Sequence, residues 1–150
     1  MNWSVAKFPE ITAETLKDGW LHTGDIARQD EYGYLYLVDR KKDMIVSGGF
    51  NVYPKEVEDT LSEHPAVVAV AVIGVPHEKW GESVKAVVVK KSGVDVTEEE
   101  LIAFCKEKRG SVMSPKSIDF VEEILKTPLG KPDKKNIRKP YWEGQDRQIG

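Results

Sequence analysis

Four short motifs in this 150-residue chain could do chemistry, and three of them place glycine beside a charged or aromatic side chain. In residues 23–25, Thr-Gly-Asp ends a predicted strand, and the Asp25 carboxylate could accept two hydrogen bonds from a sugar diol. Arg40 follows, and its planar guanidinium group can bind phosphate or hydroxyl oxygens. Each motif taken singly has a simpler interpretation. Asp25 could be a solvated residue at a β-bulge, and Arg40 one more charge in a loop.

The other two motifs lie further along the chain. Gly48 and Gly49, followed by Phe50, could let the backbone pass close to a ligand or turn at positive φ, and a tight turn between strands explains them equally well. Lys131 ends a Thr-Pro-Leu-Gly-Lys motif in what we predict to be a flexible loop. Other positive charges surround it, so it could meet an oligophosphate or a carboxylate. The alternative is a solvated basic tail.

The elements that must position these residues begin with an irregular lead-in and one helical turn, Thr12 to Leu16. Two strands, Trp20 to Ala27 and Tyr34 to Asp39, flank a turn signal and predict a hairpin. An isolated hairpin is only marginally stable in water, so we expect it to pack against another part of the protein. Five consecutive charged residues at 39–43 then separate two apolar patterns. We therefore predict three parts: 1–39 with the hairpin, a hinge at 40–43, and a domain over 44–150.

The predicted domain has the element order ββ-α-β-β-α-β, an α+β fold with helices on one face of a small sheet. The run at 67–75 is nearly continuous in β-branched residues, which is typical of a strand covered on both faces. A capping box opens the second helix at Thr97. Residues 126–139 hold six basic residues and two prolines, and they predict a loop and an exposed helical tail. The strands are expected at 44–46, 50–53, 67–75, 84–89 and 118–121, with helices from Pro54 and Thr97.

Composition narrows the class of protein. The net charge of −3 argues against general nucleic-acid binding, which usually needs a basic surface. No apolar run approaches the roughly 20 residues of a membrane span, and the start shows no secretory signal. Cys105 is predicted to pack in the core, and three scattered histidines predict no metal site. These features favour a cytoplasmic protein.

The order and spacing of the four motifs resemble the adenylate-forming enzymes, which include acyl-CoA synthetases, aryl-CoA ligases, firefly luciferase and peptide-synthetase adenylation domains. The resemblance runs from about residue 5 to the end of the chain. The sequence "GGFNVYP" is more similar to the corresponding segment of medium- and long-chain acyl-CoA synthetases than to that of amino-acid adenylating domains. The matching stretches are "DGWLHTGDIARQDEYGYLYLVDRKKDMIVSGGFNVYPKEVE", "GVPHEKWGE" and "KTPLGKPDKKNIRK".

The resemblance implies an ATP-dependent ligase that forms an acyl-AMP from a carboxylic acid, with a fatty acid favoured, and then an acyl-CoA. It places the ATP ribose hydroxyls on Asp25, and the ribose or phosphates on Arg40. Lys42 falls on the pivot about which the small domain rotates. Lys131 falls on the lysine that reaches the carboxylate and the α-phosphate. The glycine motif falls on the loop that meets the pantetheine arm of CoA, and its residues are Gly48, Gly49 and Phe50.

ATP with Mg²⁺ and CoA would then be substrates of a longer enzyme, with Mg²⁺ arriving with ATP. A large N-terminal domain is the missing partner, and the chain alone is predicted to be inactive. Two departures are visible. Val46 stands where many relatives have a lysine, so a role of that lysine in binding AMP or CoA does not carry over. Pro132 stands where an aliphatic residue usually follows Gly-Lys.

Two other functions compete with the ligase. The chain could be a stand-alone binding or regulatory module of the same fold, without catalysis. It could also use its basic tail to bind nucleic acid or an anionic membrane, which would make binding steeply salt-dependent. The joint presence of Asp25, Arg40 and Lys131 favours the ligase.

Overall fold

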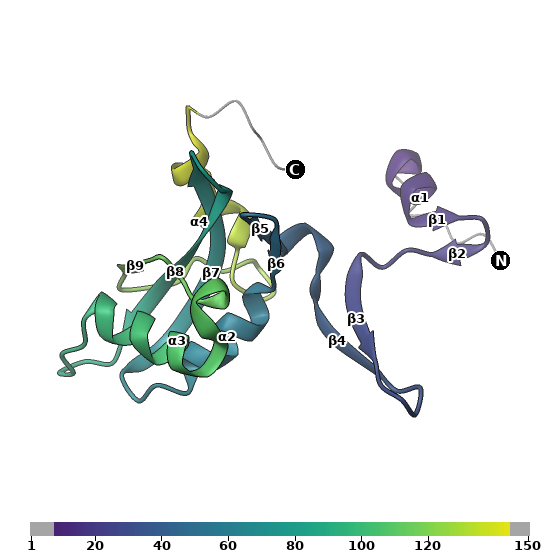
Figure 1. Ribbon diagram of the computed structural model, residues 1–150. Helices are drawn as coiled ribbons and strands as arrows, with labels where there is room; N and C mark the ends of the chain where they lie inside the picture. Colours follow the sequence, from purple (N-terminus) through teal and green to yellow (C-terminus); the bar gives the residue numbers. More distant parts are fainter. Residues whose placement is uncertain (1–7, 145–150) are drawn as a thin grey trace. The chain divides into compact units, whose positions relative to one another are not determined.

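The computed structural model describes residues 8–144 and forms two compact units, one ending at Lys41 and one beginning at Lys42. The N-terminal unit contains α1 (Pro9–Thr15), β1 (Leu16–Lys17), β2 (Trp20–Leu21), β3 (Asp25–Gln29) and β4 (Leu35–Arg40). Strands β1 and β2 pair with each other, and β3 pairs with β4 in a separate antiparallel hairpin (Figure 1).

The structure corrects two details of this unit. The helix begins at Pro9 rather than Thr12, because proline is tolerated in the first helical turn, where its missing N–H has no partner to lose. The single strand predicted from Trp20 to Ala27 is wrong. The chain leaves β2 after Leu21 and turns at Gly24, which has a φ of +75°. Only β3 therefore belongs to the predicted hairpin.

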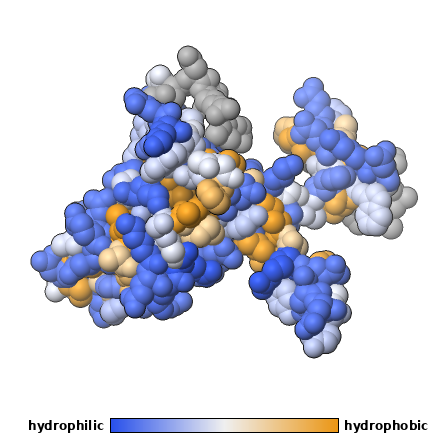
Figure 2. Space-filling view, viewed as in Figure 1, coloured by the Kyte–Doolittle hydropathy of each residue, from blue (hydrophilic) through white to orange (hydrophobic). Residues whose placement is uncertain are grey.

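No residue between 8 and 41 is buried. The unit exposes large apolar and aromatic side chains instead, and hydrophobic residues show on its surface in Figure 2. It therefore has no core of its own within the described residues, in keeping with the expectation that the hairpin needs another body. The most exposed of these side chains are Trp20, Leu21, Tyr32, Tyr34, Leu35 and Leu37.

The C-terminal unit has the predicted order of elements, following a 3-10 turn, η1 (Lys41–Asp43). The long hairpin of β7 and β8 dominates its sheet, whose strand order is β6-β5-β8-β7, with β9 parallel to β8 (Figure 1). Its elements are β5 (Ile45–Ser47), β6 (Phe50–Val52), α2 (Pro54–Ser62), β7 (Val67–His77), β8 (Gly81–Lys90), α3 (Glu98–Met113), β9 (Ser117–Phe120) and α4 (Lys134–Trp142).

Both faces of the β7–β8 hairpin are apolar, and each has its own cover. Val72 and Val84 face α2 and α3, together with the fully buried Leu61 and Leu101. Ile73 and its neighbours on the other face pack with Ile137 of α4. The prediction that β7 is covered on both faces is confirmed. The prediction of helices on one face only, with an exposed helical tail, is wrong, because α4 is the second cover.

Helix α3 begins as its sequence predicts. The Glu100 N–H donates to Thr97 Oγ1 at 3.2 Å, and the Glu100 carboxylate accepts from the Thr97 N–H at 2.8 Å. Cys105 lies fully buried on the inner face of the helix, as predicted, and this burial raises the pKa of its thiol. The cysteine is therefore a packing residue.

Helix α4 is fixed to the sheet by polar contacts near its end. The Trp142 indole N–H donates to the Gly74 carbonyl at 3.0 Å. The Tyr141 hydroxyl donates to Asp119, whose other carboxylate oxygen lies 2.7 Å from Lys85 Nζ. Partial burial, followed by the hydrogen bond and charge of Asp119, raises the pKa of Tyr141 to about 12. Burial alone would raise the pKa of Asp119, but the hydrogen bonds from Lys85 and Tyr141 bring it below its ordinary value.

We expect the stabilisation from Tyr141 to disappear at high pH. Below about pH 10 a tyrosine is neutral in both the folded and unfolded states, so the contribution is complete there. As the pH rises toward the folded pKa of about 12, only the unfolded state ionises, and stability is lost. The free energy of unfolding should therefore differ less between the native chain and Tyr141→Phe at about pH 11 than at about pH 8. Urea unfolding measures it, with the exposed Tyr34→Phe as control, and a constant difference would contradict the assignment.

Candidate active site

The register of the β3–β4 hairpin brings Asp25 and Arg40 together. They are directly opposite each other in the ladder, and Arg40 Nε lies 3.7 Å from Asp25 Oδ1. The Asp25 N–H donates to Thr23 Oγ1 at 3.2 Å, and the Lys41 N–H donates to the Gly24 carbonyl at 2.8 Å. Two hydrogen bonds, one from Asp25 and one from Lys41, thus hold the turn before Asp25. Both charged side chains stay partly exposed, so their ion pair contributes little stability and leaves oxygens and N–H groups open to a ligand.

Lys42 is the first residue of the C-terminal unit and lies inside η1. The turn places it at the junction of the two units. The predicted rotation about Lys42 stays a prediction.

The glycine motif forms the turn between β5 and β6. Gly48 and Gly49 have φ values of +58° and +86°, a region that side chains with a Cβ rarely adopt. The Gly48 N–H donates to the Trp80 carbonyl at 3.1 Å, and a Cβ on Gly48 would lie 3.5 Å from the Trp80 ring. Phe50 is 59 % exposed beside this turn. The tight turn is confirmed, and it offers bare backbone next to an exposed aromatic ring.

Lys131 lies in a loop, as predicted, and the structure adds that this loop is a closed turn. Its predicted flexibility stays a prediction. Lys126 and Pro132 form a β-bridge, and the Thr127 N–H donates to the Lys131 carbonyl at 2.7 Å. Thr127 also accepts from Gly130 through its carbonyl at 2.8 Å and from the Lys131 N–H through its hydroxyl at 3.3 Å. The Lys131 side chain is exposed. The turn therefore presents an ammonium group on a fixed backbone.

The predicted residues thus fall into two groups, each placed within its own unit. Asp25 and Arg40 form one group, while Lys131 and the glycine turn lie in the C-terminal unit. The sequence signals for both groups were local motifs, and the structure adds the hydrogen bonds that hold each motif in shape.

Comparison with known proteins decides the family. Residues 56–131 match the family described as the AMP-binding enzyme C-terminal domain. This chain belongs to that family. It is 52 % identical, over 95 % of its length, to a medium/long-chain-fatty-acid–CoA ligase of Mycobacterium tuberculosis. It is 47 % identical, over 89 % of its length, to a feruloyl-CoA synthase of an Amycolatopsis species. The resemblance predicted from the sequence is confirmed.

A solved structure agrees. ATP-bound MatB from Rhodopseudomonas palustris superposes with a TM-score of 0.83 at 37 % identity, over 91 % of this chain and 27 % of that one. The chain covers 26 % of the mycobacterial ligase and 27 % of the feruloyl-CoA synthase. It therefore spans about a quarter of the length of the curated relatives it matches.

The departure at Pro132 has a structural explanation. The bridge of which it is part uses the Lys131 carbonyl and the Asp133 N–H, which donates to the Leu125 carbonyl at 2.8 Å. Proline has no backbone N–H, and neither hydrogen bond of this bridge uses the N–H of residue 132. Pro132 is therefore compatible with the closed turn around Lys131. Val46, the other departure, is 43 % exposed on β5.

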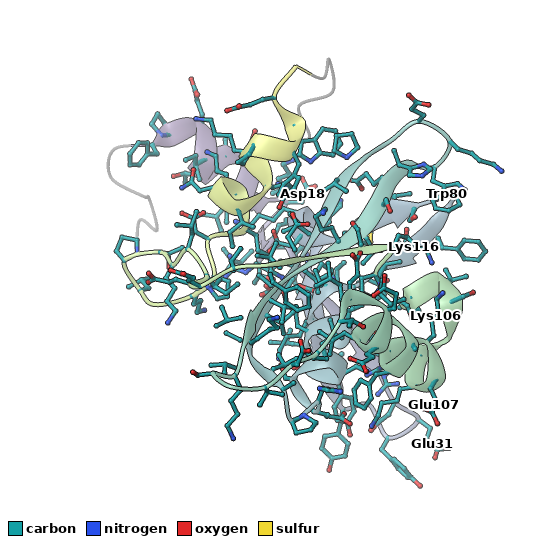
Figure 3. The ribbon with its side chains drawn as sticks, turned by 90° about the vertical axis from the view of Figure 1, so that its left-hand side faces the viewer. Asp18, Glu31, Trp80, Lys106, Glu107 and Lys116 are labelled. Carbon is teal, nitrogen blue, oxygen red and sulfur yellow. The ribbon has the colours of Figure 1, made fainter. Side chains whose placement is uncertain are left out.

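Trp80 and Glu82, which sequence analysis did not single out, hold the glycine turn. The Trp80 ring, labelled in Figure 3, stacks on His77 with centroids 4.3 Å apart. Glu82 is only 7 % exposed, and its Oε2 accepts from the Val46 N–H at 2.9 Å. A signal was present in the sequence: by the two-residue period of a strand, Glu82 shares the inner face of Val84. An acid on that face needs a partner.

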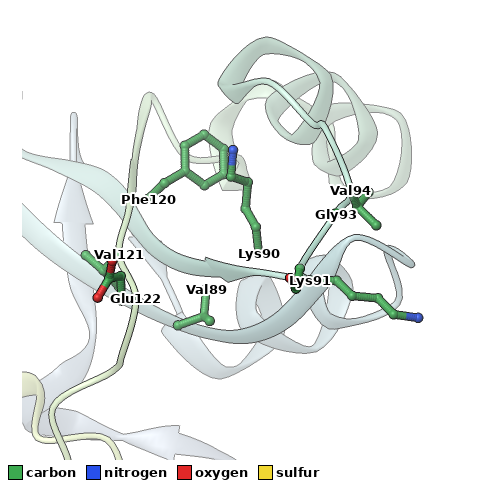
Figure 4. A pocket seen from close by; sticks show the side chains of 9 residues that line it. Val89, Lys90, Lys91, Gly93, Val94, Phe120, Val121 and Glu122 are labelled. Atoms are coloured by element: carbon green, nitrogen blue, oxygen red, sulfur yellow. The ribbon is translucent and has the colours of Figure 1, made fainter.

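One further hollow lies among the described residues of the C-terminal unit. Its volume is about 500 Å³, and it lies between residues 89–94 and 120–122, where Lys90 Nζ sits 4.5 Å from the Phe120 ring centroid (Figure 4). No predicted site residue lines it. Residues 8–144 contain no cluster of three or more His, Cys, Asp or Glu suited to a metal ion. Within the same range no helix is long and apolar enough to cross a membrane.

We expect Glu82→Ala to destabilise the chain by about 1–3 kcal/mol, because the Val46 N–H loses its acceptor. Glu82→Gln keeps a carbonyl oxygen and should lose less. Urea unfolding measures both, and Glu78→Ala is the matched control, since Glu78 is exposed on the same β7–β8 connection. Equal stability of the Glu82→Ala and Glu78→Ala variants would contradict the bracing role.

Proposed function

We propose that this chain is the mobile C-terminal domain of an acid–thiol ligase. The enzyme would form an acyl-AMP from ATP and a carboxylic acid, and then transfer the acyl group to CoA. The observation that carries the proposal is the exposed Lys131 on its closed turn, in a chain 52 % identical to a fatty-acid–CoA ligase over nearly its whole length. The ATP-bound structure of a relative supports ATP as a substrate.

In the first half-reaction a carboxylate oxygen attacks the α-phosphorus of ATP, and pyrophosphate leaves. Two anions approach each other, so a cation placed in advance lowers the barrier. Lys131 is the proposed catalytic cation. Asp25 and Arg40 would hold the ribose and phosphates. Their antiparallel register places the Asp25 carboxylate, an acceptor, beside the N–H donors of the Arg40 guanidinium group. Mg²⁺ would arrive with ATP.

In the second half-reaction the CoA thiol attacks the acyl carbonyl, a thioester bond forms, and AMP leaves. The pantetheine arm is slim, and a turn of two glycines lets it pass close to the backbone. Phe50 supplies an exposed apolar ring beside that path. The two steps would use different faces of the domain, and Lys42 is the proposed pivot that exchanges them.

A fatty acid is the proposed substrate, on the 52 % identity to a fatty-acid–CoA ligase and the "GGFNVYP" wording. A feruloyl-CoA synthase, named for a quite different acid, is 47 % identical, so this part of the enzyme depends little on which acid is activated. The residues that select the acid would then lie in a large N-terminal domain, the proposed partner. A cytoplasmic location is part of the same proposal.

The competing function is a binding or regulatory module of the same fold without catalysis. It is discriminated by joining this chain to a large domain. We use a chimera in which the chain replaces the matching C-terminal quarter of the mycobacterial relative. A catalytic domain restores both half-reactions to that enzyme, whereas a regulatory module restores neither.

Lys131→Ala in this chimera should lower acyl-AMP formation by about a hundredfold or more, because the neutralising cation is lost. Thioester formation from supplied acyl-AMP should change by less than about threefold, since Lys131 has no proposed part in it. Pyrophosphate release and acyl-CoA production measure the two steps. Lys91→Ala, which removes an exposed lysine just after β8, is the control. Equal losses in both steps would contradict the division of roles.

The chain alone should show no pyrophosphate release above background with a panel of fatty and aromatic acids. It spans only about a quarter of the ligases it resembles, and its N-terminal unit has no buried residue between 8 and 41. Turnover by the purified 150-residue chain at a rate near that of the chimera would refute this expectation.

A further inference from the structure

The turn that carries Lys131 continues into α4, and the first residue of that helix is tied to the rest of the unit. Lys134 Nζ lies 2.8 Å from Glu58 Oε1 on α2, and the two side chains are only 16 % and 13 % exposed. We propose that Glu58 and Lys134 are positioning residues that set where Lys131 meets the reacting carboxylate and phosphate. This inference rests on the proposed function of Lys131.

Glu58 is held where it stands by its neighbours. Val57 and Leu61 on the same helix are fully buried in the core, so α2 has little freedom to shift. The same oxygen, Oε1, also accepts from the Val72 N–H at 2.8 Å. Val72 belongs to β7, which is the last strand on its side of the sheet. One carboxylate oxygen therefore fixes Lys134 to the sheet edge and to α2 together.

The backbone between Lys134 and Lys131 leaves little slack. Only two residues separate them. One is Pro132, whose ring restricts its φ, and the other is Asp133. The Asp133 N–H donates to the Leu125 carbonyl, and its carboxylate caps α4 by accepting from the Asn136 N–H at 3.2 Å. A displacement of Lys134 is therefore passed directly to the closed turn.

Lys134 differs from Lys131, in the same 126–139 segment, in how its charge is compensated. Its positive charge is withdrawn from solvent and matched by Glu58, whereas Lys131 is exposed. Breaking a partly buried ion pair leaves one charge without its partner, so the turn would relax to other positions. Electrostatic catalysis is sensitive to such shifts, since a misplacement of about 1 Å can cost about a hundredfold in rate.

The test uses Glu58→Gln and Lys134→Gln, separately and together, in the chimera with the mycobacterial large domain. Asp59→Asn is the matched control, because it neutralises the next, exposed acid on the same helix. Each single variant should lower acyl-AMP formation by about tenfold and leave thioester formation within about twofold. The double variant should lose no more than either single one, because both remove the same contact. Asp59→Asn should change neither step.

A second readout is independent of activity. Amide hydrogen exchange of Gly130 and Lys131 in the 150-residue chain reports whether the turn stays closed. Exchange should become several-fold faster in Glu58→Gln and in Lys134→Gln, and stay unchanged in Asp59→Asn. Lys134→Gln retains the hydrogen bond from Val72 to Glu58, so it is the variant that keeps the test open if Glu58→Gln folds poorly.

Three results would overturn the inference. In the first, Glu58→Gln behaves like Asp59→Asn while Lys131→Ala still abolishes acyl-AMP formation, which leaves the proposed function standing. In the second, both half-reactions fall equally, which indicates a general loss of structure. In the third, Lys134→Gln alone lowers the rate, which indicates direct contact of Lys134 with phosphate. Unchanged acyl-AMP formation in Lys131→Ala would instead refute the proposed function itself.

Discussion

The C-terminal unit is organised around a hairpin whose two faces both need cover. Strands β7 and β8 alternate Val, Ile and Ala on either side, so each face would expose a row of apolar side chains if left bare. Helices α2 and α3 bury one row, and α4 buries the other. Because the hydrophobic effect scales with the apolar area removed from water, displacing the helices from either face would cost free energy. The position of α4, and of the turn just before it, follows from this requirement.

Carboxylates complete the sheet where strand pairing stops. Glu58 accepts from Val72 on β7, Glu82 from Val46 on β5, and Glu98 from Ile118 on β9. Each N–H would otherwise lack a partner in a partly buried place, and an unpaired polar group there is costly. Two of these contacts lie beside proposed functional turns: Glu82 next to the glycine turn, and Glu58 next to the Lys131 turn. The same interactions that complete the sheet would thus hold the two segments proposed to be functional.

Sequence reasoning predicted the elements with strong local signals. Three segments have a local geometry that their own residues determine. They are the β-branched run of β7, the capping box of Thr97 and Glu100, and the double glycine at 48 and 49. Sequence reasoning failed where tertiary contacts decide. Helix α4 reads as a polar tail, since Ile137 is its one aliphatic side chain, and its cover is completed by Tyr141 beyond the basic segment. The break after Leu21 was missed for a similar reason. Gly24 looked like part of a binding motif, and its turn at positive φ separates two strands that the apolar pattern joins.

The two groups of proposed site residues are held by different physics. Asp25 and Arg40 meet through the register of a hairpin that has no buried residue, so strand pairing and turn hydrogen bonds alone align them within the described part of the N-terminal unit. In our proposal Lys131 is placed by the covered apolar face of α4 and by the partly buried ion pair of Lys134 with Glu58. The second arrangement resists displacement better, because moving it exposes both apolar surface and charge. The catalytic cation proposed for Lys131 would benefit from such rigidity, because preorganised charge stabilises a transition state without reorganisation. The groups proposed to bind the nucleotide, Asp25 and Arg40, lie in the more open arrangement.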